Sequence, residues 1–339
     1  MRNGSRSAHL MRIPPNFFSI PFGISGLAVM WRVMTRVHGA PAAIADALFL
    51  TAALVWLVLM GAMLERVVRE PYSVLRQLRD PALSPFWALP PIVGMLLAVD
   101  LQPHAPADAK VVFVVFLGVT ILSAGWITGL WIADDLDQSL LHPGYFLPTV
   151  AGGLLGAQGA AGLGLRDVGW LGFGLGMVSW FMLGSMILNR LMFVKRLPAT
   201  LVPTLAIELA PPAVAGSAYL ALHGSRPDAL LYGLTGFAGL MVLVQVRLVP
   251  LYRRLRFTPG FWAFTFSWTA VASFALRWLE IERPAGEHLY ARLIGGAATV
   301  LVAMVAIRSA LAIVRGEFLP ASTARSGVAG VQTGTSTAA

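Results

Sequence analysis

The sequence has no cysteine and little charge. Asp, Glu, Lys and Arg make up 12% of its 339 residues, whereas 57% are hydrophobic. Without cysteine the chain can form neither disulfides nor thiolate metal sites, and with so little charge it cannot cover the surface of a soluble protein of this length. Its mean hydropathy is +0.73, and its apolar stretches reach the roughly 20 residues that a membrane-spanning helix needs. The composition therefore predicts an all-α integral membrane protein.

Hydropathy windows of about 19 residues predict ten transmembrane helices. The predicted spans are 15–34, 43–64, 84–101, 111–133, 146–165, 168–189, 200–222, 229–250, 259–279 and 289–314. The chain then divides into an N-terminal cytoplasmic segment (1–14), a ten-helix transmembrane domain (15–318) and a tail (319–339). The tail is rich in small and polar residues, which predicts disorder.

The basic residues predict the orientation in the membrane. The net charge is +9, but Lys and Arg lie at the ends of apolar runs and not along one soluble face, which argues against a nucleic-acid partner. Of the 25 Lys and Arg residues, fifteen fall on the side of the N-terminus, eight on the other side, and two, Arg247 and Arg308, within predicted spans. The positive-inside rule then predicts cytoplasmic N- and C-termini in the cell inner membrane.

Proline is concentrated in alternate predicted spans. A proline inside a helix removes a hydrogen bond and kinks the helix, and in a membrane the freed carbonyl needs a partner from a packed neighbour or a water-filled cavity. We therefore predict five helical hairpins, in which the odd helices form a central pore and the even helices lie outside. The alternative is that proline is simply commoner in membrane helices. The ninth span departs from the pattern, because its one proline, Pro259, lies at its start.

Glycine supports the same arrangement, because Gly23, Gly94 and Gly152 lie in odd spans. Glycine also serves ordinary helix packing, and the even sixth span contains glycines too, so glycine alone does not distinguish the two classes of helix. The predicted pore-lining or kink residues are Pro21, Phe22, Gly23, Pro90, Pro91, Gly94, Pro148, Gly152, Pro211 and Pro212.

Glu208 is the most prominent ionisable residue within a predicted span, three residues before a double proline. Ionisable groups in membranes are costly and are functional candidates. Glu208 is either a proton-coupling or gating acid, or a structural acid paired with an arginine such as Arg247 or satisfied by freed backbone. Asp100 and Arg277 lie near span ends and are interpreted as interfacial. No nucleophile spacing, phosphate-binding loop or metal-ligand cluster occurs, so we predict no enzyme, no cofactor and no metal.

The ninth span contains two closely spaced aromatics in WAFTFSW (262–268). Phe264 and Phe266 are two residues apart and point to different faces of a helix. If the odd helices form a pore, one of these rings faces the axis, where it could act as a hydrophobic gate. The alternative is that both rings simply pack between helices.

Five segments resemble the tellurite-resistance/dicarboxylate transporter family, which includes the TehA proteins of bacteria, fungal malate and sulfite exporters, and the slow anion channels of plant guard cells. The segments are PPNFFSIPFGISGLAVMWR near the start, HPGYFLPTVAGG (142–153), LRDVGWLGFGLGMVSW (165–180), IELAPPAVAGSAYL (207–220) and WAFTFSW. The resemblance implies ten helices in five hairpins around a central pore, a homotrimer with one pore per subunit, and Phe266 as the phenylalanine that plugs the pore. The family pattern has no acid at the position of Glu208.

The resulting prediction is a channel for small inorganic or organic anions. The inner helices carry almost no basic residues, so we expect anion preference to come from helix dipoles and freed N–H groups, with basic cytoplasmic loops enriching anions at one mouth. A carboxylate beside the path would repel an anion unless neutral or paired. The alternative is therefore a proton-coupled secondary transporter of a C4-dicarboxylate, or of a sulfite- or tellurite-type anion, that uses Glu208. A non-transporting membrane scaffold or sensor is a third possibility.

Overall fold

A computed structural model describes residues 13–224 and 226–318, and within them all regular structure is helical. The predicted disordered tail lies outside the described residues. The α-helices are α2 (Ser19–His38), α3 (Ala42–Arg69), α4 (Pro71–Arg79), α5 (Leu89–Asp100), α6 (Pro106–Ala133), α7 (Gly152–Gly162), α8 (Arg166–Phe193), α9 (Ala210–His223), α10 (Ala229–Tyr252), α11 (Trp262–Glu282) and α12 (Glu287–Val314). The short helices are η1 (Pro15–Phe18), η2 (Ser84–Ala88), η3 (Gln138–Leu140), η4 (Pro143–Tyr145), η5 (Leu147–Ala151), η6 (Val202–Leu209) and η7 (Pro259–Phe261).

The membrane character that the composition predicts is carried by the long helices. Among the described residues, 7 helices are long and apolar enough to cross a membrane, or up to 8 if a bent pair counts as one span. The bent pair joins α4 to the segment Ser84–Asp100 at an angle of 114°. Since α5 and α7 have only 12 and 11 residues, they do not qualify as spans by themselves.

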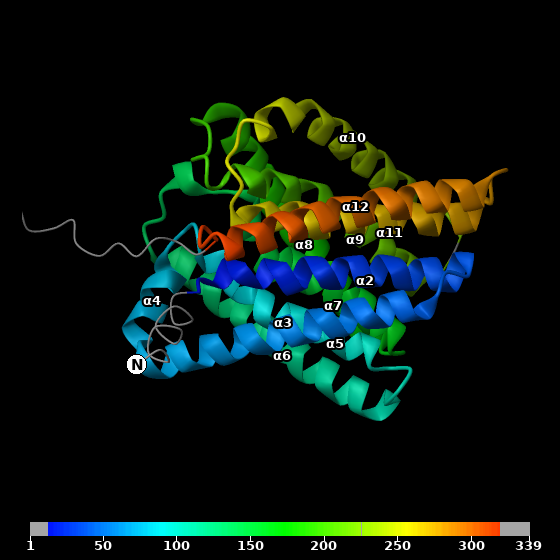
Figure 1. The fold of residues 1–339 in the computed structure, drawn as a ribbon, viewed down its shortest axis with the longest axis horizontal. Coiled ribbons are helices and arrows are strands. Elements are labelled where there is room, and N and C mark those ends of the chain that lie inside the picture. The colour runs from blue at the N-terminus through cyan, green and yellow to red at the C-terminus, as the bar shows by residue number, and fades with distance from the viewer. Residues whose placement is uncertain (1–12, 225, 319–339) are drawn as a thin grey trace, which may run out of the picture.

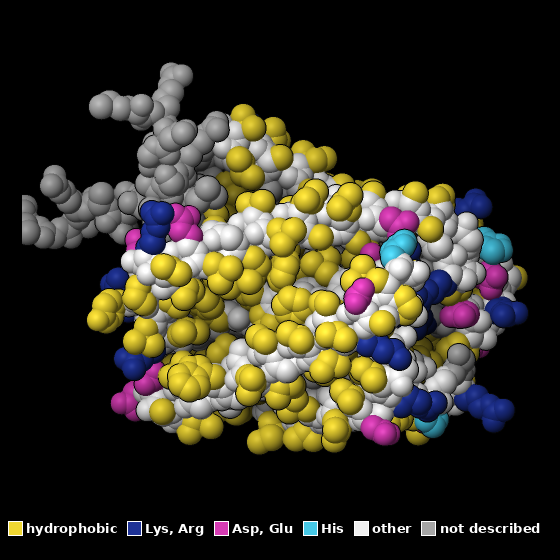
Figure 2. Space-filling view, turned by 90° about the horizontal axis from the view of Figure 1, so that it is seen from below, with side chains coloured by type: hydrophobic (Ala, Val, Ile, Leu, Met, Phe, Trp, Pro, Cys, Tyr) yellow, Lys and Arg dark blue, Asp and Glu magenta, His cyan; other side chains and the backbone are white. Residues whose placement is uncertain are grey.

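The helices fall into two classes by burial. The apolar windows of the segments that contain α2 and α9 are 72% and 89% buried, whereas those of α3, α6, α8, α10 and α12 are between 17% and 33% buried. The second class exposes large apolar side chains such as Leu122, Phe181 and Leu243. Figure 2 shows apolar side chains over the middle of one face and charged ones toward its two ends. A wide apolar belt between charged ends is what a lipid-facing surface requires.

The more buried class, α2, α5, α7, α9 and α11, is called here the inner helices. Each inner helix contacts the next, and α11 closes the ring by packing on α2. Each is also packed against the helix that follows it: α2 on α3, α5 on α6, α7 on α8, α9 on α10 and α11 on α12. In Figure 1, α12 and α3 lie on either side of α2 in the view, although they come from opposite ends of the chain.

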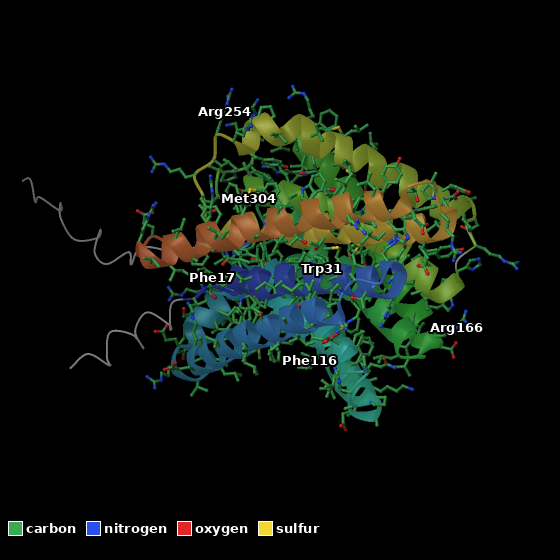
Figure 3. The ribbon with its side chains drawn as sticks, turned by 45° about the vertical axis from the view of Figure 1, so that its right-hand side comes forward. Phe17, Trp31, Phe116, Arg166, Arg254 and Met304 are labelled. Carbon is green, nitrogen blue, oxygen red and sulfur yellow. The ribbon has the colours of Figure 1, made fainter. Side chains whose placement is uncertain are left out.

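The inner helices all begin at the same end of the bundle. The short helices that precede them touch one another, with η1 against η2 and η7, and η6 against η7. The described ends of the chain also meet here, since the rings of Phe17 and Phe318 are 5.3 Å apart. Figure 3 shows Phe17 and Arg254 toward one end and Arg166 toward the other.

The prolines mark the point where each inner helix becomes α-helical. Pro21, Pro90 and Pro211 stand in the first turn of α2, α5 and α9, directly after 3₁₀ turns, and Pro148 lies in the π-helical turn η5. The first turn of a helix has no intrahelical partner for its N–H groups, so proline costs little there. A change from 3₁₀ or π to α geometry thus takes the place of the mid-helix kinks that we predicted.

The helix α4 was not predicted. Its residues lie in the connection between the predicted spans 43–64 and 84–101. It carries Arg76 and Arg79 in its last turn, and most of its residues are exposed. At 9 residues it is too short for hydropathy windows of about 19 residues to detect.

The hairpin of α7 and α8 depends on glycines that allow backbone contact. A Cβ atom on Gly153 would lie 2.7 Å from the backbone nitrogen of Gly176 and 2.8 Å from the carbonyl oxygen of Gly172. Gly153 of the fifth predicted span and Gly172 and Gly176 of the sixth therefore share one packing role, whereas a Cβ added to Gly174 would meet open space.

We expect Gly153→Ala to destabilise the protein by about 1–3 kcal/mol, because the added methyl group would force the two backbones apart. Thermal and denaturant unfolding of the purified protein in detergent measures this loss. Gly174→Ala is the matched control and should leave stability unchanged or slightly raised. Equal stability of the two variants would contradict the packing role of Gly153.

Candidate functional site

Three cavities follow one another through the ring of inner helices. The proximal cavity, at the end where these helices begin, has a volume of about 200 Å³ and is lined by residues from all of the inner helices or the short helices before them. The middle cavity is smaller, at about 30 Å³. The distal cavity, at the end where the inner helices finish, measures about 350 Å³. Val29, Leu96, Leu155 and Gln158 line both the middle and the distal cavity, so these two adjoin.

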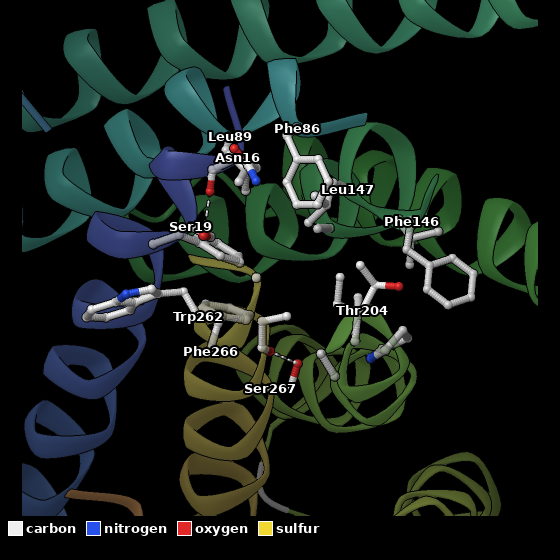
Figure 4. Close-up of a pocket in the computed structure, with 18 of the residues that line it drawn as sticks. Asn16, Ser19, Phe86, Leu89, Phe146, Leu147, Thr204, Trp262, Phe266 and Ser267 are labelled. Carbon is white, nitrogen blue, oxygen red and sulfur yellow. Dashed lines mark hydrogen bonds between the residues drawn. The ribbon is translucent and has the colours of Figure 1, made fainter. Parts of the chain in front are cut away.

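The proximal cavity is mainly apolar, and hydroxyl groups that line it donate to nearby backbone carbonyls. Figure 4 shows Phe86, Leu147 and Trp262 among the side chains around it, together with Ser19 and Thr204. Ser19 donates to the carbonyl oxygen of Asn16 at 2.6 Å, and Thr204 donates to that of Leu201 at 2.6 Å. The hydroxyl protons of Ser19 and Thr204 are therefore already used within their own turns.

Phe266 lies where the proximal and middle cavities adjoin, because it lines both, together with Leu155 and Val214. Its ring stacks on that of Phe22, with the centroids 3.8 Å apart and the planes 14° apart. Only 8% of Phe266 and 5% of Phe22 is exposed. Stacked apolar rings keep water out of the space that they fill.

Gly26 makes room for the Phe266 ring. A Cβ atom on Gly26 would lie 2.8 Å from Cδ2 of Phe266 and 2.6 Å from Oγ1 of Thr269. The hydroxyl of Thr269 is itself held by bonds of 2.9 Å to the carbonyl oxygens of Thr265 and Phe266. The ring therefore lies in a fitted slot between α2 and α11.

Phe264, the other aromatic considered at this position, packs elsewhere. Its ring lies 4.8 Å from that of Tyr252 and 5.7 Å from that of Phe261, and it lines none of the three cavities. The sequence placed the two rings on different faces of α11, and the structure shows which face each one takes.

The distal cavity carries charge that the sequence did not lead us to expect. Arg32, Arg36 and Arg277 line it, together with Asp100 and Glu280. The expectation that inner helices contribute almost no basic side chains to the path is wrong at this end. Arg32, Asp100 and Arg277 lie near the ends of predicted spans and Arg36 lies just beyond one, and nearness to a span end does not reveal whether a side chain faces lipid headgroups or a cavity.

Glu208 is buried in η6, with 7% of the residue exposed, but it lines none of the three cavities. Its Oε1 atom is shielded and has no hydrogen-bond partner among the described residues. Arg247, the partner considered for it, is exposed, and no ion pair joins the two. A buried polar atom without a partner is costly, so Glu208 remains a candidate proton-coupling or gating residue to test by substitution.

The other candidate residues divide into lining and packing positions. Phe22 and Pro211 line the proximal cavity. The remaining candidates line none of the three cavities: Pro21, Gly23, Pro90, Pro91, Gly94, Pro148, Gly152 and Pro212. Gly94 and Gly152 instead admit side chains of α6, since an added Cβ would lie 2.7 Å from the ring of Phe116 and 2.8 Å from a methyl group of Thr120.

Within the described ranges, no group of three or more His, Asp or Glu side chains is placed to hold a metal ion.

We expect Gly26→Ala to destabilise the protein by about 1–3 kcal/mol, because its methyl group would overlap the Phe266 ring. In a Phe266→Ala background the cost should fall, which gives a coupling of at least about 0.5 kcal/mol in a double-mutant cycle. Denaturant unfolding in mixed micelles measures all four proteins. Gly118→Ala, where an added Cβ meets open space, is the control; additive effects of the Gly26 and Phe266 changes would contradict the slot.

Comparison with known proteins adds the identity of the family. The chain is 28% identical to the "Tellurite resistance protein TehA homolog" of Haemophilus influenzae, over 90% of this chain and 92% of that protein. It is 24% identical to the "S-type anion channel SLAH2" and 22% identical to the "Guard cell S-type anion channel SLAC1" of Arabidopsis thaliana, over 87% and 80% of this chain. The chain spans 58% and 50% of these two plant proteins. The family model for the SLAC1 "Voltage-dependent anion channel" matches residues 12–315, so this multi-pass membrane protein belongs to that family.

Proposed function

We propose that the protein is an anion channel whose pore runs through the proximal, middle and distal cavities. The observation that supports this proposal is that Phe266, whose ring stacks on that of Phe22, lines both the proximal and the middle cavity, together with Leu155 and Val214. We expect removal of that ring to widen the passage between these two cavities, and the middle cavity adjoins the distal one. We infer that Phe266, stacked on Phe22, is the gate.

The proposal includes an architecture and an assembly. The inner helices and the helices that follow them span the membrane ten times as five hairpins, around a pore in each subunit of a homotrimer. The closed ring of contacts among the inner helices supports the hairpin arrangement.

The protein resides in the cell inner membrane, with both termini in the cytoplasm. The distribution of Lys and Arg supports this orientation.

Helix dipoles supply the preference for anions at the proximal mouth. The N-terminal end of a helix carries roughly half a positive charge, and the inner helices all begin at this end. Their combined field attracts anions without fixing them, because the nearby hydroxyls are already bonded to backbone carbonyls. Conduction needs sites that are favourable enough to enter and weak enough to leave.

We expect Phe266→Ala to raise anion conductance about tenfold or more, which corresponds to removal of about 1.4 kcal/mol of barrier. Planar bilayers or oocytes with chloride and nitrate gradients give the conductance and the reversal potential. Phe264→Ala is the matched control, because it removes a buried ring from the same helix at a position outside the cavities. If Phe266→Ala folds and conducts no better than the wild type, Phe266 is not the gate.

A second function is favoured by one observation, the buried Glu208 with an unpartnered oxygen. In a proton-coupled carrier of a C4-dicarboxylate, or of a sulfite- or tellurite-type anion, this group would gain and lose the coupled proton. Its position away from the three cavities means that such a carrier must move η6 during transport.

We expect Glu208→Gln to leave anion flux unchanged in liposomes if the protein is a channel. If it is a carrier, the same substitution should abolish uptake driven by an imposed pH gradient while the protein still folds. Flux of chloride, nitrate, malate and sulfite, with and without the gradient, decides between the two, since a channel follows the anion gradient alone.

A further inference from the structure

The distal mouth presents an electrostatic problem for an anion. The inner helices finish there, and each helix C-terminus carries roughly half a negative charge. The field that draws anions into the proximal cavity therefore opposes them in the distal cavity. Positive side chains at that mouth would remove the difficulty, and three arginines line the cavity.

Arg32 is already neutralised. Its Nη2 atom contacts Oδ1 of Asp46 at 2.8 Å and also pairs with Oδ1 of Asp100. Two carboxylates around one guanidinium leave no positive charge for a third anion. This cluster ties α2 to α3 and α5, and we interpret it as structural.

Arg36 and Arg277 differ from Arg32, because neither forms an ion pair within the described residues. Arg36 is exposed and Arg277 is half-buried. The Nε atom of Arg277 is shielded from solvent and has no hydrogen-bond partner in the described part of the chain. The shielded Nε atom is out of reach of the cavity, but Arg277 lines that cavity, so an anion there can accept from the other N–H groups of its guanidinium.

We propose that Arg36 and Arg277 form a binding site for a small monovalent anion at the distal mouth. The inference rests on the proposed channel function, which it extends with a defined site at the end opposite the helix N-termini. Anions bind at this site and pass from it into the middle cavity beside Gln158, which lines both the middle and the distal cavity.

Charge and size select the kind of anion. Arg32, Arg36 and Arg277 line the cavity against the carboxylates of Asp100 and Glu280, so the lining carries about one positive charge, which matches a monovalent anion. Guanidinium groups bind planar oxyanions through paired N–H donors, which favours nitrate or a small monocarboxylate. The middle cavity, at about 30 Å³, admits only a small ion.

The competing explanation is that the two arginines only stabilise the ends of α2 and α11 through the helix dipole. That role needs the positive charge but no ligand. The two explanations predict different results. Only a binding site makes nitrate stabilise the protein through these arginines, and only a binding site makes their replacement change how conductance depends on nitrate concentration.

The test uses full-length wild type, Arg36→Gln, Arg277→Gln and the control Arg292→Gln. Arg292 is exposed, lines none of the three cavities and lies at the same end, one turn from His288, whose ring is 6.0 Å from that of His38. Thermal unfolding in detergent is followed against nitrate concentration, with gluconate, a bulky anion, holding ionic strength constant. Conductance is measured against nitrate concentration in planar bilayers, with each protein also carrying Phe266→Ala.

We expect nitrate to stabilise the wild type and Arg292→Gln in a saturable manner. In Arg36→Gln and Arg277→Gln the half-saturating nitrate concentration should rise about tenfold, as loss of one charge-assisted bond implies. The conductance curves should also shift to higher nitrate concentration, but only when nitrate is added on the side of the bilayer that the distal mouth faces. Because Arg36 is exposed, its variant keeps the test valid if Arg277→Gln fails to fold.

Nitrate stabilisation that is absent in the wild type, unchanged in both arginine variants, or equally reduced in Arg292→Gln would overturn the site. Arginine-dependent nitrate binding without conductance in any of the proteins would leave the site standing and refute the channel. Conductance through Phe266→Ala with unaltered nitrate binding in Arg36→Gln and Arg277→Gln would refute the site and support the channel.

Discussion

The common direction of the inner helices is the constraint on which the rest of this protein depends. A helix in a membrane must satisfy its backbone groups within itself or against protein and water. Here the exposed N–H groups of the helix starts are gathered at one end, in the short 3₁₀ and π turns around the proximal cavity. First-turn prolines such as Pro90 and Pro211 reduce the number of N–H groups that need a partner. The same gathering creates a positive field at the proximal mouth.

A narrow passage follows from the way the ring closes. The contact between α2 and α11 depends on Gly23 and Gly26, where added Cβ atoms would meet Thr265, Phe266 and Thr269. Close approach of these helices brings the ring of Phe266 onto that of Phe22. In the proposed channel, the residues that allow this tight packing also set the obstruction, so pore width and stability would be coupled at this point. Apolar rings can gate such a passage without any charged group, because a dry constriction is already a barrier to an ion.

The sequence predicted most of the fold and part of the candidate site. Hydropathy placed the long helical segments, because long apolar runs are a strong signal. Proline stands in the first turn of α2, α5 and α9, but the less buried α10 also contains Pro250 and the buried α11 has no proline within it, so proline alone does not separate the two classes. The role of proline was harder to read, since a residue such as Pro21 is compatible with either a first turn or a kink. Resemblance to a known family singled out Phe266 as the pore residue. The position of Phe264 is known only from the structure, in which its ring packs against that of Tyr252. The distal arginines were missed, because position near a span end does not reveal that a side chain faces a cavity.

Parallel helices around one path make its two mouths electrostatically unequal. At the proximal mouth backbone dipoles suffice, whereas at the distal mouth the same dipoles oppose an anion and side chains must reverse the sign. Arg32 is paired with Asp46 and Asp100 and cannot offset the negative helix ends. In our proposal, Arg36 and Arg277 supply the positive charge instead. Backbone dipoles cannot be altered without changing the fold, but arginine side chains can be replaced one at a time. In the proposed channel, anion preference can therefore be altered by side-chain substitution at the distal mouth, whereas the field of the helix starts at the proximal mouth is fixed by the fold.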